Sequence, residues 1–418
     1  MTDIRILKCS KCGREYAPGS VEYTCTVCGE VGTLDVLYDY EALKGKLDRD
    51  ALASGEFSMW RYRSLLPIGE SSPVPPLAVG MTPTYYAPRL AADLGISQAW
   101  VKDDGRNPTG SLKDRASALV VARAMEQGVG TVSAASTGNA AAALAGICAS
   151  VGRSPIIFVP ASAPEAKIAQ LLVYGATVLL VEASYDHAFD LCMQISIEQG
   201  WYCRNTGVNP FTAEGKKTVA FEMAEQLAWD VPDAVVVTVG DGNILAGVHK
   251  GFSDLFRLGW ISRIPRLIGV QAEGSSPLVK AWQTGQSAAD MQPVEAETVA
   301  DSISAGLPRD RSKALRAVRE TGGAFVAVPD DAIIASIPAL ARLTGVFSEP
   351  AAAAAYAGCR RAVELGYIQP EERVLLLLTG SGLKDVRRAQ QSVSGGIRVA
   401  PNADAVRRAL GLSLKGEG

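Results

Sequence analysis

Short, continuously apolar runs alternate with longer alanine-rich stretches along most of this chain. The runs are AWVKDD, TVSAAS, PIIFVP, TVLLVE, AVVVTVG, LIGVQA and RVLLLLTG. Strands that are apolar on both faces are typical of a parallel sheet that helices cover on both sides. The stretches at 115–127, 139–151, 164–174 and 216–229 have the length and spacing of such helices. We therefore predict an α/β fold whose strands are joined by right-handed crossovers.

The N-terminal region lies outside this alternation. Within residues 9–28, two CxxC pairs are separated by twelve residues, a spacing typical of four thiolates around a tetrahedral zinc ion. Gly13 and Gly29 follow these pairs, where a tight turn is needed. Four thiolates leave no open coordination position, so the zinc would be structural; the alternative is a ribbon that has lost its metal. The predicted ligands are Cys9, Cys12, Cys25 and Cys28.

Two further segments need a separate interpretation. Residues 36–80 are predicted to be irregular, with SSPVPPLAVG as a linker into the main body. The run AAAAAY at 351–356 is predicted to be helix rather than disorder.

Composition restricts the class of protein. A chain of 418 residues with 48% hydrophobic content can bury a large core, divided into two or three domains. The 41 basic and 44 acidic residues offer nothing that attracts nucleic acid or an anionic membrane. The apolar run at 140–151 is too short to span a bilayer, and MTDIRILKCSKC has no signal-peptide core. We expect a soluble cytoplasmic protein without a disulfide scaffold.

The stretch GRNPTGSLKDRASA holds a lysine in an unusual position. Asn107, Pro108 and Gly110 predict a turn, Ser111 is a candidate N-cap, and Lys113 would lie in the first turn of the next helix. There its ammonium would face the positive end of the helix dipole, which lowers the pKa of a lysine. Since the chain has two histidines and no triad arrangement around them, chemistry led by histidine is not expected.

Three other loops follow predicted strands and open helices, where ligands bind in open α/β sheets. They are STGN at 136–139, VGDGN at 239–243 and TGSG at 379–382. Each is weak evidence alone, because many strand-to-helix turns use glycine. Together with Lys113 they form an ordered set.

This ordered set resembles the fold-type II enzymes that use pyridoxal 5′-phosphate (PLP), and within them the threonine synthases. The resemblance covers nearly the whole chain, including the zinc-ribbon-like N-terminus. It implies two three-layer α/β/α domains with the cofactor between them. The implied division is a ribbon at 1–35, an extension at 36–80, a large PLP-binding domain at 81–114 and 206–400, a small domain at 115–205 and a tail at 401–418. It also implies a homodimer.

The resemblance assigns roles to particular residues. Lys113 would bind PLP covalently, Asn139 would contact the ring hydroxyl, and Thr379 would meet the pyridine nitrogen. Glu349, in SEPAAAA, would lie near the cofactor. The phosphate of PLP would be held by Gly240, Asp241, Gly242 and Asn243, and the amino-acid substrate by Ser136 and Thr137.

One departure from the family pattern concerns the substrate. Threonine synthases carry an arginine in an NPxRxEGxKT-like stretch, and the resemblance assigns it to the phosphate of the substrate. This chain reads NPFTAEGKKT, so Thr212 stands in that place. Lys216, Lys217 and Arg106 are the candidate replacements, as motif-borne cations. A second departure, Asp241, puts a carboxylate in the loop for the cofactor's phosphate unless its side chain turns away.

The expected activity is conversion of O-phospho-L-homoserine and water to L-threonine and phosphate. Two alternatives remain open at this point. One is another PLP enzyme of amino-acid metabolism, either a serine/threonine ammonia-lyase or a cysteate-synthase-like enzyme acting on O-phosphoserine. The other is a non-catalytic binding or regulatory protein.

Overall fold

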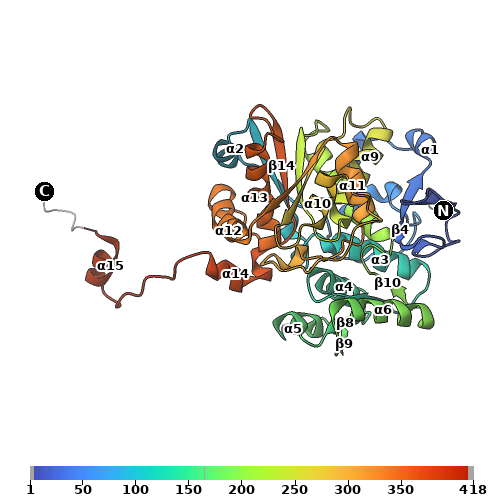
Figure 1. Ribbon diagram of the computed structural model, residues 1–418, viewed down its shortest axis with the longest axis horizontal. Coiled ribbons are helices and arrows are strands. Elements are labelled where there is room, and N and C mark those ends of the chain that lie inside the picture. Colours follow the sequence, from blue (N-terminus) through green and yellow to red (C-terminus); the bar gives the residue numbers. More distant parts are fainter. Residues whose placement is uncertain (1–3, 164, 413–418) are drawn as a thin grey trace.

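Three β-sheets organise the chain in the computed structural model, which describes residues 4–163 and 165–412 (Figure 1). The largest sheet has the strand order β13-β12-β11-β14-β6-β5. Its pairs are parallel except β5 with β6, which is antiparallel. The strands are β5 (Thr84–Tyr86), β6 (Gln98–Asp103), β11 (Ala234–Thr238), β12 (Arg266–Ala272), β13 (Ala324–Val328) and β14 (Arg373–Leu378).

Helices cover both faces of this sheet, which explains its continuously apolar strands. Val236 and Leu376 pack with α2, α12 and α13, whereas Val235 and Leu375 face the cluster that contains α8, α9 and α11. Alternate residues of one strand are thus buried on opposite sides. These helices are α2 (Pro88–Leu94), α8 (Thr218–Gln226), α9 (Asn243–Arg257), α10 (Pro277–Thr284), α11 (Arg311–Glu320), α12 (Asp330–Thr344) and α13 (Pro350–Glu364).

A smaller parallel sheet, β10-β7-β8-β9, forms a second three-layer unit. Phe158 packs against α6, whereas its neighbours Ile157 and Val159 pack against α4 and α5. The elements are β7 (Val132–Ala135), β8 (Ile156–Pro160), β9 (Thr177–Val181), β10 (Tyr202–Cys203), α4 (Asn139–Ser150), α5 (Glu165–Val173) and α6 (Tyr185–Gln199). Helices α3 (Lys113–Glu126) and α7 (Phe211–Lys216) pack against each other in the body of the molecule. The predicted α/β class and its paired three-layer units are confirmed.

The N-terminal residues form a four-stranded antiparallel sheet in the order β2-β1-β4-β3. Its strands are β1 (Ile4–Cys9), β2 (Glu15–Tyr16), β3 (Thr24–Cys25) and β4 (Gly29–Tyr38). The prediction that residues 36–80 are irregular was partly wrong. Strand β4 continues to Tyr38, and it is followed by α1 (Tyr40–Lys44) and by 3-10 helices at Asp50–Ser54 and Met59–Leu65.

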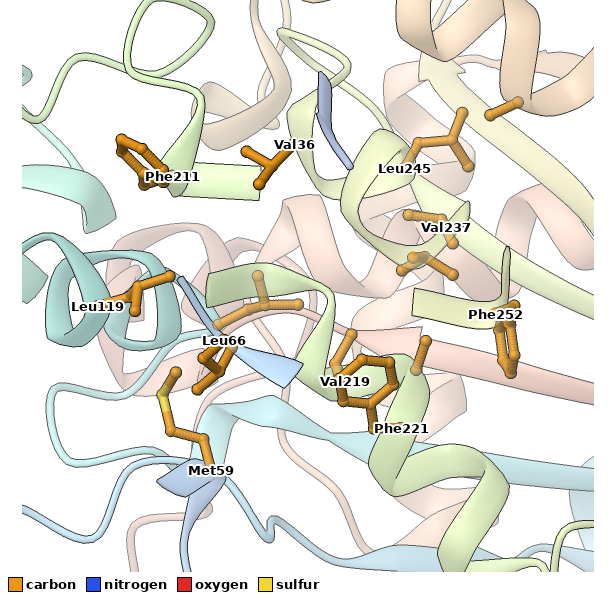
Figure 2. Packing of buried hydrophobic residues seen from close by; sticks show 14 of the residues in the cluster. Val36, Met59, Leu66, Leu119, Phe211, Val219, Phe221, Val237, Leu245 and Phe252 are labelled. Carbon is orange, nitrogen blue, oxygen red and sulfur yellow. The ribbon is translucent and has the colours of Figure 1, made fainter. Parts of the chain in front are cut away.

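One large core joins this N-terminal region to the body of the molecule. Figure 2 shows Val36 and Met59 from the N-terminal region near Leu119 of α3 and Phe211 of α7, with Val237 of the large sheet beyond them. The segment at 36–80 escaped prediction because its apolar residues occur in one-turn pieces without a helical or strand period. Their burial depends on surfaces that distant parts of the chain provide.

Each of the seven predicted strands is present, and the predicted helices correspond to α3, α4, α5 and α8 with small shifts at their ends. The expected burial was wrong for TVLLVE, which forms β9 at the edge of the small sheet with Leu179 and Leu180 exposed. Residue 164, the predicted start of one of them, lies outside the described residues. Strands β5, β10 and β13 were not predicted, whereas AAAAAY lies in α13 as expected. The chain then leaves the body through α14 (Val386–Gln391) and α15 (Ala403–Leu410), and Figure 1 shows this tail extending away. Among the described helices, none has the length and apolarity needed to cross a bilayer.

Candidate active site between the two parallel sheets

A cavity of about 700 Å³ lies where the small sheet meets the large one. The loop after β7 lines one side of it, and the loop after β11 lines another. Residues 293–309 contribute further lining. Because both β7 and β11 deliver their carboxyl ends here, the cavity occupies the usual ligand position of an open α/β fold. The predicted residues that line it are Lys113, Ser136, Thr137, Asn139, Lys216, Gly240, Asp241, Gly242 and Asn243.

Lys113 begins α3 and is half-buried at this cavity. Burial, together with the nearby Arg204 guanidinium, lowers the pKa of Lys113 to about 8. The predicted direction is therefore confirmed, although burial rather than the helix dipole is the main cause. The predicted cap is wrong: α3 has Leu112 at its N-cap position, and the hydroxyl of Ser111 has no hydrogen-bond partner among the described residues.

The STGN loop meets a distant carboxylate. Asn139 begins α4, and its Nδ2 donates to Glu349 Oε1 at 2.8 Å. Burial raises the pKa of Glu349. Ser136 accepts a hydrogen bond from the Gly138 amide at 3.2 Å, which turns the loop towards the cavity. The amide group of Asn139 is thus held at the cavity by a residue that lies more than two hundred positions away.

The VGDGN loop leads from β11 into α9. Gly242 has φ +87°, a left-handed conformation that favours glycine, and it forms the N-cap of α9. The first amide groups of α9 have no acceptor within the helix, so they can bind an anion at the cavity. Asp241 turns towards the backbone amide of Arg309, at 3.4 Å, and burial raises its pKa. A raised pKa makes this carboxyl easier to neutralise beside a phosphate.

Backbone hydrogen bonds join the loop that precedes Lys113, the TGSG loop and the SEPAAAA segment to one another. Thr379 accepts a hydrogen bond from the Leu112 amide at 2.9 Å, and Ser381 donates its amide proton to Gly110 at 3.0 Å. The Glu349 amide donates to Gly380 at 3.2 Å. Thr379 is buried, and it does not belong to the described residues that line the cavity. Glu349 lines a second, smaller cavity of about 50 Å³ next to Asn139.

The four residues singled out around the missing arginine separate into different environments. Lys216 lines the cavity and donates to Asn243 Oδ1. Lys217, its neighbour, is fully buried and forms ion pairs with Glu214 and Asp254 instead. Arg106 is exposed and lies outside the cavity lining, and Thr212 is buried with its hydroxyl bonded to Asn209 O at 2.8 Å. The geometry therefore gives no support to a substrate-binding role for Lys217 or Arg106.

Sequence reasoning missed several residues that line the cavity, among them Tyr185, Arg204 and Thr238. Arg204 follows the two-residue strand β10, which is too short to be recognised from an apolar run. Tyr185 begins α6, and Thr238 ends β11. Of these, Thr238 offered a signal, because it is a polar residue at the carboxyl end of a predicted strand.

The four cysteines of the N-terminal sheet are close together. Their sulfur atoms lie within 4.8 Å of one another. The amides of Lys11 and Cys12 both point at Cys9 Sγ, at 3.4 Å, and Gly13 and Gly29 have positive φ as the predicted turns require. This donor set suits a tetrahedral metal ion.

This chain is similar to known proteins over most of its length. Residues 76–380 match the model of the family described as pyridoxal-phosphate dependent enzyme. The threonine synthase of Methanocaldococcus jannaschii is 39% identical over 405 residues, which cover 96% of this chain and 98% of the relative. The threonine synthase of Methanosarcina acetivorans is 41% identical, with 97% and 98% covered.

Solved structures show the same fold at lower identity. A threonine deaminase from Solanum lycopersicum has a TM-score of 0.64 at 22% identity, covering 83% of this chain and 89% of that one. A diaminopropionate ammonia lyase from Escherichia coli also has a TM-score of 0.64, at 18% identity, covering 81% and 92%. From the family match and the full-length relatives, the chain belongs to the pyridoxal-phosphate-dependent enzymes and, within them, to the threonine synthase family.

Proposed function

We propose that this protein converts O-phospho-L-homoserine and water to L-threonine and phosphate, with PLP as its cofactor. The observation that carries the proposal is the meeting of Lys113 with the anion-binding start of α9 at one cavity. An amine of lowered pKa and a row of unpaired backbone amides match the aldehyde and the phosphate of PLP. The full-length threonine synthase relatives favour this reaction over the alternatives.

The residues at the cavity fit the cofactor. Thr238 lines the cavity, and its buried hydroxyl has no hydrogen-bond partner among the described residues. A bound cofactor would supply that partner. We propose that Lys113 binds PLP covalently and that Asn139 lies at its ring hydroxyl. For Thr379, the proposed position at the pyridine nitrogen rests on the family resemblance alone, because Thr379 is buried outside the cavity lining. The loop at 240–243 would hold the phosphate of PLP. When bound, PLP supplies an electron sink for the carbon atoms of the substrate.

The protein's own groups would supply binding and proton transfer. Because the pKa of Lys113 is lowered to about 8, its Nζ can be neutral and can take a proton from a substrate carbon and return it. Ser136 and Thr137, in the loop that opens α4, would bind the amino acid. Lys216 would add positive charge for the phosphate of the substrate.

The remaining features complete the proposal. Cys9, Cys12, Cys25 and Cys28 would bind one structural zinc ion, because four thiolates leave no position for substrate. The three sheets would mark a ribbon, a large domain and a small domain, with the ribbon continuing to the end of β4. A cytoplasmic homodimer is the expected form, by analogy with the family.

Substrate profiling tests this function. The purified protein, saturated with PLP, would be offered O-phospho-L-homoserine, O-phospho-L-serine, L-threonine and L-serine, while release of phosphate and 2-oxoacid is followed. We expect phosphate and threonine from the first substrate. A protein that is inert to O-phospho-L-homoserine but forms 2-oxoacid from threonine or serine would be an ammonia-lyase, and activity on O-phospho-L-serine alone would indicate a β-replacement enzyme.

A further inference from the structure

Arg204 has a partly unpaired guanidinium at the cavity of the candidate active site. Its side chain is 1% exposed, and it lines the cavity from the end of β10. Nε donates to Ser117 Oγ at 3.2 Å and Nη1 to Thr206 Oγ1 at 2.7 Å. Nη2 is buried and has no hydrogen-bond partner among the described residues. One side of the guanidinium fork is therefore available to a ligand.

Arg204 also lacks an acidic partner. Arg115, which is buried in the same helix as Lys113, forms ion pairs with Asp104 at 2.7 Å and with Glu222. Arg204 forms no ion pair within the described part of the chain. A buried cation without a counter-ion is costly, so an anionic ligand is the natural source of the missing charge.

Basic side chains surround this arginine at the cavity, and burial disfavours their protonated forms. Burial comes first among the causes that lower the pKa of Lys113 and Lys216, and the Arg204 guanidinium acts in the same direction on both. Burial likewise lowers the pKa of Arg204 itself, to about 10. Asp114 and Asp241 are the acids whose charges act on Arg204, and burial raises the pKa of both carboxyls, which weakens them as counter-charges. An anion bound in the cavity would offset this cost of burial and favour the protonated forms of the basic groups.

The backbone around Arg204 is fixed beside the loop that we propose for the substrate. The Arg204 amide donates to Ser133 O at 2.8 Å, and Asn205 Oδ1 accepts from the Ala135 amide at 2.8 Å. These two hydrogen bonds connect the segment to β7, which leads directly into the STGN loop. Tyr23 of the N-terminal sheet adds a further bond, from the Cys203 amide at 2.9 Å. The guanidinium is therefore held in position before any ligand binds.

We propose that Arg204 binds the phosphate group of the substrate and replaces the arginine that this chain lacks at Thr212. The inference rests on the proposed function and names the residue that selects a phosphorylated substrate. Thr212 bonds to Asn209 and lies outside the cavity lining, so it cannot serve. A guanidinium fork matches two phosphate oxygens, which a lysine ammonium cannot do. Lys216 also lines the cavity, from the end of α7.

The test compares Arg204→Gln and Arg204→Lys with Arg311→Gln in the PLP-loaded protein. Arg311 is a matched control, since it is buried, bonds only to backbone carbonyls of Ala288 and Pro308 within the described residues, and is not among the residues that line the cavity. In Arg204→Gln we expect the KM for O-phospho-L-homoserine and the Kd for inorganic phosphate to rise roughly 10- to 100-fold. Arg204→Lys should lie between this variant and the wild type.

Three further readouts make the outcome decisive. Binding of L-threonine and the absorbance of bound PLP should stay unchanged in Arg204→Gln, as should all properties of Arg311→Gln. Unchanged phosphate affinity in a folded Arg204 variant would overturn the inference. A loss of PLP with an unchanged KM for O-phospho-L-homoserine would also overturn it, because Arg204 would then bind the cofactor and not the substrate. A wild type that is inert to O-phospho-L-homoserine would refute the proposed function instead, and calorimetric phosphate binding would then decide on Arg204 alone.

Discussion

Neutralising Lys217 should strongly destabilise the protein, although this residue is not at the cavity. Its Nζ lies 2.6 Å from Glu214 Oε2 and 2.8 Å from Asp254 Oδ2, and its side chain is fully buried. The hydroxyl of Tyr38 donates to the same Glu214, and Lys250 lies 2.5 Å from Asp254 Oδ1. This cluster joins β4 of the N-terminal sheet to α7, which ends at Lys216, and to α9, which follows the VGDGN loop.

The expected size of the effect follows from these contacts. Lys217→Met keeps the aliphatic stem but leaves Glu214 and Asp254 buried with one remaining cation. Removing one partner of a buried ion pair costs about 3–5 kcal/mol. The ammonium also lies 4.2 Å from the centre of the Tyr38 ring, a cation–π contact worth about 1 kcal/mol. Because Lys250 still compensates part of the charge, we expect a loss of about 3–5 kcal/mol in the free energy of unfolding.

The effect should depend on pH in a defined direction. Burial alone would raise the pKa of Asp254, but Lys217 and Lys250 outweigh burial and hold it below its usual value of 3.8. A carboxyl whose folded pKa is depressed contributes stability that is present above its unfolded pKa and is lost as the pH falls through the folded one. The difference between wild type and Lys217→Met should therefore narrow below about pH 4.

Urea denaturation of the PLP-loaded protein, followed by fluorescence, measures this difference. The matched control is Lys44→Met, since Lys44 forms a surface ion pair with Glu41 at the same 2.8 Å but with 42% of its side chain exposed. Surface pairs contribute about 0–1 kcal/mol, so the control should scarcely change stability. A Lys217→Met protein within about 1 kcal/mol of the wild type at neutral pH would refute the reasoning.

Three further predictions concern the cofactor, the metal and helix packing. The rate at which PLP-free protein binds PLP covalently should rise with pH and level off near the pKa of Lys113, about 8, because the neutral amine reacts. A rate that does not change with pH would contradict this expectation. Lys113→Ala should retain no cofactor after borohydride reduction. Elemental analysis should find one zinc per chain, absent from Cys9→Ser/Cys12→Ser; a metal-free wild type prepared without chelator would exclude the site. Gly247→Ala, whose methyl would lie 2.9 Å from a side chain of α7, should lower the unfolding free energy by about 1–3 kcal/mol, whereas Gly130→Ala, with nothing within 4 Å, should not.

The layered α/β fold could be predicted because its strands are apolar on both faces. A parallel strand buried between two helix layers needs apolar residues at every position, and a run such as RVLLLLTG records that need locally. The clustered cysteines and the motif loops were equally local, since each is set by spacing over a few residues. Strand β10 and the short elements within residues 36–80 have no such local pattern, because their burial depends on distant parts of the chain.

The composition of the cavity wall required the tertiary structure. Lys216 and Lys217 are adjacent in the sequence and equally plausible as phosphate ligands, yet successive residues of a helix point about 100° apart. The packing of α7 against α3 and α9 decides that one lysine reaches the cavity and the other an acidic cluster. Arg204 enters the cavity because β10 pairs with β7. Local pattern thus determined the long apolar strands and the helices between them. Long-range packing determined the short elements and which side chains meet, since a side chain's neighbours belong to segments that no local pattern brings together.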